Sequence, residues 1–234
     1  MNRSAELEMM DLPGQPRELL AGNLRDLRIL NRYLGSYRSV LSGLARLVRE
    51  QNLRSFTLLD VGTGSADIPA AIAQWARRRN IAARISAVER DSITVEQAMG
   101  HTKSLGEIAI VRGDALAPPF RSGSFDFILA SQLLHHFPDE QIIALLRTWA
   151  RLARRAIIVS DLLRHPLAYH GIRLLTRGFT RNPMTRVDAP LSVRRACTLA
   201  EWGELIRRAD IGRFRIQRVF PYRVLGVILL KSQS

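Results

Sequence analysis

Residues 58–69, with the sequence LLDVGTGSADIP, constrain the fold of this chain more than any other segment. An apolar run ends in an acid at Asp60, two glycines follow at Gly62 and Gly64, and a helix-forming segment covers 66–79. Strand, tight loop and helix in this order form the unit that holds a nucleoside-bearing ligand at the carboxyl end of a parallel sheet. The glycines let the backbone turn sharply and approach such a ligand without a Cβ clash.

The acids of this segment indicate which kind of ligand the loop can hold. A dinucleotide site of the form G-x-G-x-x-G needs a third glycine at position 67, where this chain has Asp67. The backbone N–H groups of such a loop attract anions, but the carboxylates of Asp60 and Asp67 would repel a pyrophosphate. A ligand that carries an ammonium and a sulfonium group would be attracted instead.

Beyond this unit, apolar runs and helical patterns alternate along the chain. Alternation of this kind predicts a parallel sheet with helices on both faces. The strands are expected at 56–61, 84–89, 107–111, 125–130, 155–160, 213–220 and 223–230. The helices are expected at 16–30, 36–50, 66–79, 92–102, 139–153, 166–179 and 198–209. Pro183 and Pro190 predict an irregular stretch between the last two helices.

The glycine loop resembles the first motif of the class I S-adenosylmethionine-dependent methyltransferases, (D/E)-x-G-x-G-x-G. This chain reads Asp60-Val61-Gly62-Thr63-Gly64-Ser65-Ala66, so an alanine replaces the third glycine. The segment FDFILASQLLHHF at 125–137 also resembles a segment of that family closely. The resemblance covers 56–161 most strongly.

The resemblance implies an α/β fold, a doubly wound, seven-stranded, mostly parallel sheet of the Rossmann-like methyltransferase type whose last strand runs antiparallel. It also implies a domain division. Residues 1–54 would form an N-terminal helical lid, and 55–234 the S-adenosylmethionine-binding methyltransferase domain, with a cap insertion at 162–197 after the fifth strand. We expect the lid and the cap insertion to cover the acceptor.

The same resemblance assigns the cofactor-binding residues. Glu89, at the end of the second strand, would accept hydrogen bonds from both ribose hydroxyls. Asp114 and the backbone of Ala115 would contact the adenine, and Ser131 would lie near the methionine moiety. The complete set of expected cofactor contacts is Asp60, Gly62, Thr63, Gly64, Asp67, Glu89, Arg90, Asp114, Ala115 and Ser131.

The sequence indicates the type of methyl acceptor less directly than it indicates the cofactor. The Asn/Asp-Pro-Pro-aromatic tetrapeptide of many DNA and nucleobase-amino methyltransferases is absent after the fourth strand, where this chain has Ser131. Three further segments resemble bacterial small-molecule methyltransferases of the quinone-biosynthesis type. These are EMMD at 8–11, NRYLG at 31–35, and 188–195, in which Asp188 is followed by SVRR.

Histidine is the side chain best suited to remove a phenolic proton near neutral pH. His135 follows the fourth strand at the mouth of the expected cofactor site, although it also fits a packed structural role. His170 and Arg173 share one face of the 166–179 helix, as a base and an anion holder if that face points inward, or as a solvated basic face if it does not. The expected catalytic residues are therefore His135, His170 and Arg173.

The composition indicates which partners and which cellular compartment to expect. The net charge of +14 comes almost entirely from arginines, which are spread through every element. Scattered arginines favour solvated faces over a specific nucleic-acid site. A single cysteine, Cys197, fits a reducing compartment, and no apolar run reaches the length of a membrane span. We expect a cytoplasmic protein without a metal site, with possible peripheral membrane contact through the basic amphipathic 166–179 helix.

Together these observations predict an S-adenosylmethionine-dependent methyltransferase that acts on a small aromatic, quinol or polyketide-type acceptor. O-methylation is preferred over C-methylation. Two alternatives stay open: an RNA methyltransferase, which charge alone favours, and a non-catalytic S-adenosylmethionine-binding partner protein. The acceptor's identity and the oligomeric state are not determined by the sequence.

Overall fold

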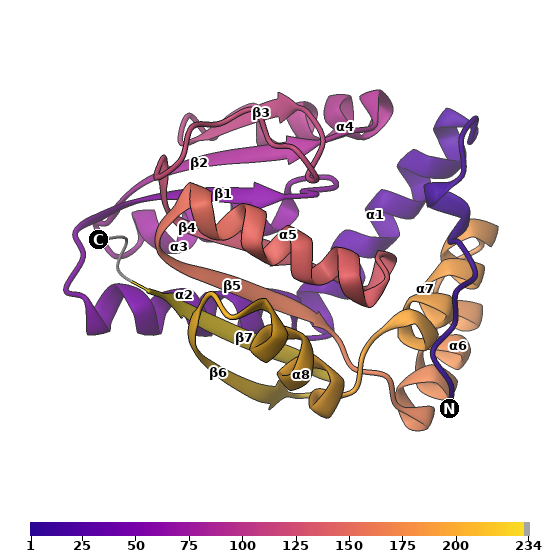
Figure 1. Cartoon of the computed structure of the whole chain (residues 1–234). Helices are drawn as coiled ribbons and strands as arrows, with labels where there is room; N and C mark the ends of the chain where they lie inside the picture. Colours follow the sequence, from indigo (N-terminus) through magenta and orange to yellow (C-terminus); the bar gives the residue numbers. More distant parts are fainter. Residues whose placement is uncertain (232–234) are drawn as a thin grey trace.

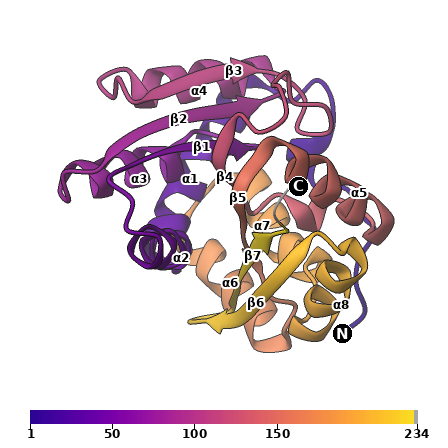
Figure 2. The same cartoon turned by 60° about the vertical axis from the view of Figure 1, so that its left-hand side comes forward.

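A computed structural model describes residues 1–231 and shows one seven-stranded sheet (Figure 1). The strand order is β3-β2-β1-β4-β5-β7-β6, and Figure 2 shows this order from β3 at the top to β6 at the bottom. Strand β7 runs antiparallel to both neighbours, and the other neighbouring pairs are parallel, as the resemblance implies. The strands are β1 (Ser55–Val61), β2 (Ala82–Glu89), β3 (Ile108–Arg112), β4 (Phe125–Ser131), β5 (Ala153–Leu162), β6 (Gly212–Val219) and β7 (Arg223–Leu230).

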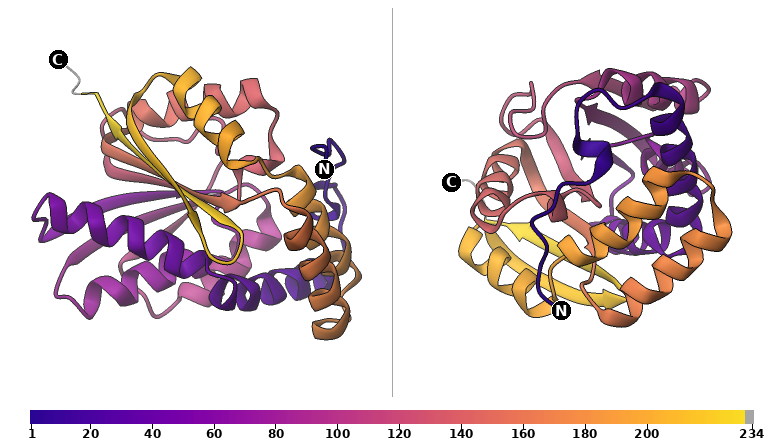
Figure 3. Two further views of the ribbon diagram at one scale, coloured as in Figure 1. Left: turned by 90° about the horizontal axis from the view of Figure 1, so that it is seen from below. Right: turned by 90° about the vertical axis from the view of Figure 1, so that its right-hand side faces the viewer.

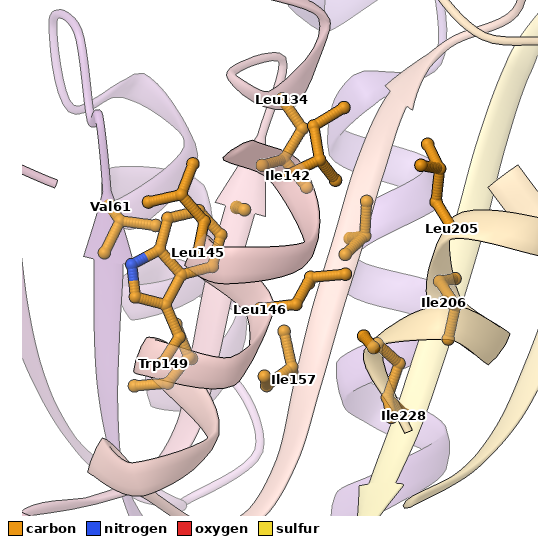
Figure 4. Packing of buried hydrophobic residues seen from close by; sticks show 14 of the residues in the cluster. Val61, Leu134, Ile142, Leu145, Leu146, Trp149, Ile157, Leu205, Ile206 and Ile228 are labelled. Atoms are coloured by element: carbon orange, nitrogen blue, oxygen red, sulfur yellow. The ribbon is translucent and has the colours of Figure 1, made fainter. Parts of the chain in front are cut away.

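Helices cover both faces of the sheet (Figure 3, left). On one face, α5 and α8 enclose an apolar cluster that includes Trp149 and Trp202, and on the other, α2 and α3 enclose a cluster around Phe127 (Figure 4 shows the first). Successive residues of the central strands enter opposite clusters, which is the period-two pattern of a strand buried on both faces. These helices are α2 (Ser36–Glu50), α3 (Asp67–Arg77), α4 (Ser92–Thr102), α5 (Asp139–Leu152) and α8 (Leu199–Ala209); α4 packs on β2 and β3.

A separate group of helices lies beyond the carboxyl ends of the parallel strands (Figure 1). It consists of α1 (Arg17–Tyr33), α6 (Pro166–Phe179), α7 (Pro183–Arg195) and the N-terminal segment 1–12, which contains the short helix η1 (Met9–Asp11). Figure 3, right, shows the N-terminal segment crossing this edge of the molecule. Two chain segments that lie far apart in the sequence therefore build this one group of helices, which we call the cap.

The prediction of an irregular stretch between α6 and α8 is wrong, because this part of the chain forms the helix α7. Asn182 caps α7 by accepting hydrogen bonds from the backbone N–H groups of Met184 and Thr185, and Pro183 takes a first-turn position where its missing N–H costs nothing. Pro190 removes one helical hydrogen bond from the interior. The helix persists because residues along it, among them Met184 and Leu191, are buried.

The N-terminal helices do not act as one unit. Helix α1 contacts α7, and the hydroxyl of Thr185 on α7 lies 2.9 Å from two acceptors on α1, Asn23 Oδ1 and Asp26 Oδ2, to either of which it can donate. Helix α2 instead packs on β5 and β7 and contributes Val40 and Leu44 to the sheet core. Within the described residues, no helix combines the length and the apolar character that a membrane crossing needs.

Candidate functional site

The loop between β1 and α3 has the backbone that its sequence indicates. Gly62 and Gly64 both have positive φ, at +66° and +57°, which favours glycine. A Cβ atom on Gly62 would lie 2.6 Å from Cδ1 of Leu133, so even alanine is excluded there unless Leu133 moves. A Cβ atom on Gly64 would meet no atom within 4 Å. Gly62 is thus required by packing, whereas Gly64 borders open space.

That space is a cavity of about 420 Å³ at the carboxyl ends of the parallel strands. It extends from the glycine loop to the cap, which closes it from the opposite side. Every residue that the sequence analysis assigned to the cofactor lines this cavity, and so does His135. These residues are Asp60, Gly62, Thr63, Gly64, Asp67, Glu89, Arg90, Asp114, Ala115 and Ser131.

Three of the lining residues carry buried polar atoms without a hydrogen-bond partner among the described residues: Glu8, at Oε1, on the cap side, and Asp60, at Oδ1, and Ser131, at Oγ, on the sheet side. The other oxygen of Asp60, Oδ2, accepts a hydrogen bond of 2.6 Å from the hydroxyl of Thr63. Unpaired buried polar atoms are costly, so native structures pair them with protein, water or a ligand. A carboxylate and a hydroxyl in this position fit the cationic amino-acid end of S-adenosylmethionine.

Burial, together with the negative charges of Asp67 and Glu89, raises the pKa of Asp60 to about 7, although the hydrogen bond from Thr63 opposes the shift. At neutral pH this carboxyl group is therefore partly protonated when no cation is near. A bound cation favours the ionised form, so binding and deprotonation are coupled.

This coupling predicts pH-dependent cofactor affinity. A cationic ligand binds the ionised form of Asp60, whose population falls as the pH falls through about 7. Affinity should thus decrease by roughly tenfold between pH 8 and pH 6. Calorimetric titration of the protein with S-adenosylmethionine at several pH values measures this change in affinity. Asp60→Asn should bind more weakly and lose most of the pH dependence; equal affinity of the unmodified protein at pH 6 and pH 8 would contradict the prediction.

Glu89 lies at the end of β2, directly beside the glycine loop. Its Oε2 accepts a hydrogen bond of 3.0 Å from the backbone of Gly64, and its Oε1 accepts bonds of 2.8 and 3.1 Å from the backbones of Arg90 and Asp91. Burial raises the pKa of Glu89, although these three N–H groups oppose the shift. The carboxylate is held in one orientation, and its remaining lone pairs are free for ribose hydroxyls.

The loop after β3 forms another wall of the cavity. Asp114 Oδ1 accepts a hydrogen bond of 2.9 Å from the backbone of Leu116, which shapes the turn. The carbonyl of Ala115 accepts a bond of 2.9 Å from the indole of Trp149 on α5. Core packing around Trp149 therefore holds the backbone that the resemblance places against adenine.

His135 belongs to a buried network of charges. Its Nδ1 lies 2.6 Å from Asp161 Oδ1, and its Nε2 lies 3.5 Å from Glu8 Oε1. Burial alone would lower the pKa of His135, but the carboxylates of Asp161 and Glu8 outweigh it and raise that pKa to about 10. A histidine that is protonated at neutral pH has no lone pair for an acceptor's proton, so this environment does not suit the expected general base.

His170 and Arg173 are both exposed on α6 and line neither this cavity nor its neighbour. The helix face that they share points to solvent, as expected for a solvated basic face and not for a base and an anion holder at the acceptor. Apolar residues of the same helix, Leu167, Ile172 and Leu175, line the neighbouring cavity instead. The prediction that His170 and Arg173 face the acceptor is therefore wrong, because neither residue lines this cavity or its neighbour.

The neighbouring cavity has a volume of about 390 Å³ and adjoins the first. Its walls come from α1, α6, α7 and the β6–β7 turn, and most of its lining is apolar. The two cavities share the lining residues Leu27, Gln132, Leu162, Ala189 and Ser192. A molecule in the second cavity would thus meet a ligand in the first near these shared residues.

Gln132 and Arg223 are functional candidates that the sequence analysis missed. Gln132 lies at the junction, has a positive φ of +53°, and its side-chain amide donates a hydrogen bond to Asn31. Positive φ is uncommon outside glycine, and its presence directly after the fourth strand was a signal visible only in coordinates. Arg223 is only 3% exposed. It lines the second cavity, and its Nη1 has no hydrogen-bond partner among residues 1–231.

The comparisons with known proteins agree with this geometry. A family model described as a methyltransferase domain matches residues 58–156, from β1 into β5. No curated protein sequence matches the chain significantly.

Three solved structures with similar folds are distant in sequence. A SAM-dependent methyltransferase from Aquifex aeolicus is 16% identical, with a TM-score of 0.59 over 80% of this chain and 89% of that chain. Human N-acetylserotonin methyltransferase, in complex with SAM, is 17% identical, with a TM-score of 0.68 over 99% of this chain and 63% of the human one. The plantazolicin methyltransferase BamL, with bound SAH, is 15% identical, with a TM-score of 0.66 over 92% of this chain and 97% of BamL. At sequence identities of 15% to 17%, the structural similarity establishes the fold alone.

Proposed function

We propose that this chain, a class I S-adenosylmethionine-dependent methyltransferase of the small-molecule type, methylates a lipophilic phenol, quinol or polyketide-like molecule. One observation carries the proposal: a largely apolar cavity of about 390 Å³ adjoins the cavity that the cofactor-binding residues line. Cavities of this size and character bind small organic molecules. Human N-acetylserotonin methyltransferase and BamL, which share the fold, bear names that indicate small-molecule substrates.

The chain's part in cofactor binding follows from the residues around the first cavity. When bound, S-adenosylmethionine supplies the reactive methyl group, and the protein supplies position and electrostatics. Asp60 and Ser131 offer unpaired oxygens to the cofactor's amino-acid end, Glu89 offers acceptors to its ribose, and the loop at Asp114 and Ala115 offers contacts to its adenine.

Arg223 is the residue we assign to the acceptor. Its Nε donates a hydrogen bond of 2.6 Å to the carbonyl of Leu34, which leaves Nη1 for an oxygen of the bound molecule. Burial lowers the pKa of Arg223 to about 10, and the charges of Asp161 and Asp67 limit that decrease, so the side chain stays cationic near neutral pH. A buried cation beside a phenol lowers the phenol's pKa and holds its oxygen in place. This favours O-methylation over C-methylation.

His135 is not a free general base for the acceptor, because the carboxylates of Asp161 and Glu8 keep it protonated near neutral pH. Among the described residues that line the two cavities, only His135 and His136 carry imidazoles, and each has one ring nitrogen against a carboxylate, Asp161 at 2.6 Å or Asp11 at 2.7 Å. We propose that the acceptor loses its proton to water, assisted by the positive charge of Arg223, while Gln132 and Ser192 line the junction where the oxygen lies.

The cap would act as a lid over both ligands. Its two segments are joined by the packing of α1 on α7 and by hydrogen bonds from the backbones of Met9 and Met10 to Asp188, at 2.7 and 3.0 Å. Residues on both segments line the acceptor cavity. Excluding water would strengthen the electrostatic effect of Arg223. A cytoplasmic location, the absence of a specific nucleic-acid partner, and peripheral membrane contact through α6 stay predictions from the sequence.

The proposal predicts which molecules accept the methyl group. Incubated with methyl-labelled S-adenosylmethionine, the protein should methylate an alkyl- or aryl-substituted phenol or quinol on oxygen, with activity rising as the apolar substituent grows to fill the second cavity. Mass spectrometry locates the label on the ring oxygen or carbon. Transfer to RNA but to no phenol would support the alternative RNA methyltransferase, and cofactor binding without transfer to any acceptor would support the non-catalytic alternative.

A further inference from the structure

We propose that Glu8, His135 and His136 bind one divalent transition-metal cation, of which Zn²⁺ is the reference case. One potential ligand atom from each of these residues lies within 4.8 Å of the others. Two imidazole nitrogens and a carboxylate oxygen form a ligand set that zinc and non-haem iron accept. This proposal departs from the sequence analysis, which expected no metal, because Glu8 is 127 residues away from His135 in the chain and no local motif joins them.

Both imidazoles are held as metal-binding histidines usually are. His135 Nδ1 lies 2.6 Å from Asp161 Oδ1, and His136 Nδ1 lies 2.7 Å from Asp11 Oδ2. A carboxylate that accepts the Nδ1–H of a histidine selects one tautomer, leaves Nε2 as a lone-pair donor and makes it more basic. Two adjacent histidines with separate carboxylate partners are thus both oriented to offer Nε2.

Glu8 completes the set with an atom that lacks a partner. The residue is 1% exposed, and its Oε1 has no hydrogen-bond partner among the residues that the structure describes. Oε1 lies 3.5 Å from His135 Nε2. That distance is long for a hydrogen bond but close to the spacing of about 3.3 Å between two ligands that each lie about 2.0 Å from a tetrahedral metal ion.

Arg195 is a second cation close to Glu8. Its Nε is 3.8 Å from Glu8 Oε1, but the N–H groups of its guanidinium donate to backbone carbonyls. Nε donates to His135 at 3.3 Å, one Nη donates to His136 at 2.7 Å, and the other donates to Glu6. Arg195 therefore fixes the backbone of both histidines and of the N-terminal segment. The cationic group that faces Oε1 of Glu8 at the shorter distance, 3.5 Å, is His135, whose Nε2 proton a metal ion would replace.

The charges also leave room for a cation. Glu8, Asp11 and Asp161 contribute three negative charges, and Arg195 contributes one positive charge, so a metal ion that displaces the proton of His135 has two negative charges to balance. Buried charges need compensation. A divalent ion supplies it at the place where the potential ligand atoms meet.

The position of these residues indicates what the ion would do. All three line the 420 Å³ cavity, and a set of three protein ligands leaves coordination positions open to another molecule. A hydroxyl group of a bound molecule that occupies an open position would bind as its conjugate base, with its proton released to water, because a metal ion lowers the pKa of a bound hydroxyl group. This role rests on the proposed function, whereas metal binding itself does not.

The test is a titration of full-length protein, freed of metal by chelation, with Zn²⁺ in competition with a chromophoric chelator. We expect one Zn²⁺ per chain and a rise in melting temperature that follows the Zn²⁺ concentration. Glu8→Gln should weaken binding by at least tenfold. Asp161→Asn should weaken it by roughly 10–100-fold, because it removes the partner that orients His135.

Glu6→Gln provides the matched control. Glu6 lies two residues from Glu8, its side chain is exposed, and its nearest cation is Arg194 at 3.6 Å, so its Zn²⁺ affinity should equal that of the unmodified protein. Substoichiometric binding, or Glu8→Gln binding as tightly as Glu6→Gln, would overturn the site. S-adenosylmethionine binding by each variant verifies its fold. Because the titration contains no acceptor, failure of the metal site leaves the methyltransferase proposal intact.

Discussion

Replacing Glu89 with alanine is expected to weaken S-adenosylmethionine binding by at least a hundredfold. The substitution removes the acceptor of two ribose hydrogen bonds, each worth roughly 1.5–3 kcal/mol when one partner is charged. The sum of roughly 3–6 kcal/mol corresponds to a factor of roughly 10²–10⁴ in the dissociation constant. The same carboxylate accepts hydrogen bonds from Gly64, Arg90 and Asp91, so its loss also frees the glycine loop. Calorimetry on the purified variant measures the change.

Glu107→Ala controls for the loss of an acid elsewhere on the sheet, since Glu107 precedes the amino end of β3, at the edge opposite to Glu89. Glu107 pairs with Arg77 on the surface and lines neither cavity, so its removal should leave cofactor affinity unchanged. Glu89→Gln should fall between the two, because an amide keeps one acceptor and loses the charge. If Glu89→Ala binds the cofactor as well as Glu107→Ala does, the ribose assignment is wrong, although the other cofactor contacts are not tested by that result.

Filling the second cavity should abolish most activity without affecting the cofactor. Gly171 lies on α6 and lines this cavity, and a Cβ atom there would meet no atom within 4 Å. Gly171→Trp should therefore fold and place an indole where the acceptor binds. We expect the acceptor's KM to rise by at least tenfold, which corresponds to a loss of about 1.4 kcal/mol or more, with an unchanged dissociation constant for S-adenosylmethionine.

Gly178→Trp is the matched control on the same helix. Gly178 is also free of atoms within 4 Å of an added Cβ, but it lines neither cavity. Both variants exchange a helical glycine for the same side chain, so they share any change in helix propensity. Equal acceptor KM values for the two variants would show that the acceptor binds elsewhere, and the metal site and the cofactor site would each remain as separate questions.

The two cavities also explain why the cap matters to an enzyme of this fold. The sheet and its glycine loop supply one wall of the cofactor cavity, and the cap supplies the other, with Leu20 and Leu24 from α1 and Ala189 and Ser192 from α7. The acceptor cavity depends on the cap even more, since α6 contributes Leu167, Ile172 and Leu175. Changes in the cap should thus alter acceptor choice before they alter cofactor binding.

The sequence by itself determined the fold and identified residues that line the first cavity. Strand and helix periods are local properties of the chain, and the predicted strands agree with the observed ones to within about two residues at most ends. That these residues line one cavity was predictable for the same reason. Asp60, Glu89 and Ser131 lie within the last two residues of their strands, and parallel strands bring their carboxyl ends to one edge.

The tertiary structure alone decided the arrangement of the cap. The local signal from Pro183 and Pro190 opposes a helix, yet burial stabilises α7. Helices α1 and α2 have similar amphipathic patterns in sequence, but α1 joins the cap and α2 covers the sheet. An apolar helix face predicts that something covers it and does not say what, because the same face satisfies any apolar partner.

The chemistry of His135 depended on tertiary structure in the same way. An imidazole near neutral pH can serve as a base, a structural cation or a metal ligand, and its neighbours decide among these. Here they are Glu8, Asp161 and Arg195, which long chain segments separate and which the cap brings within a few ångströms. Electrostatic energy depends on distance in space and on burial, and neither is a property of separation along the chain. The resembling segments at 8–11, 31–35 and 188–195 carried this information only as unconnected motifs until folding placed them around one cavity.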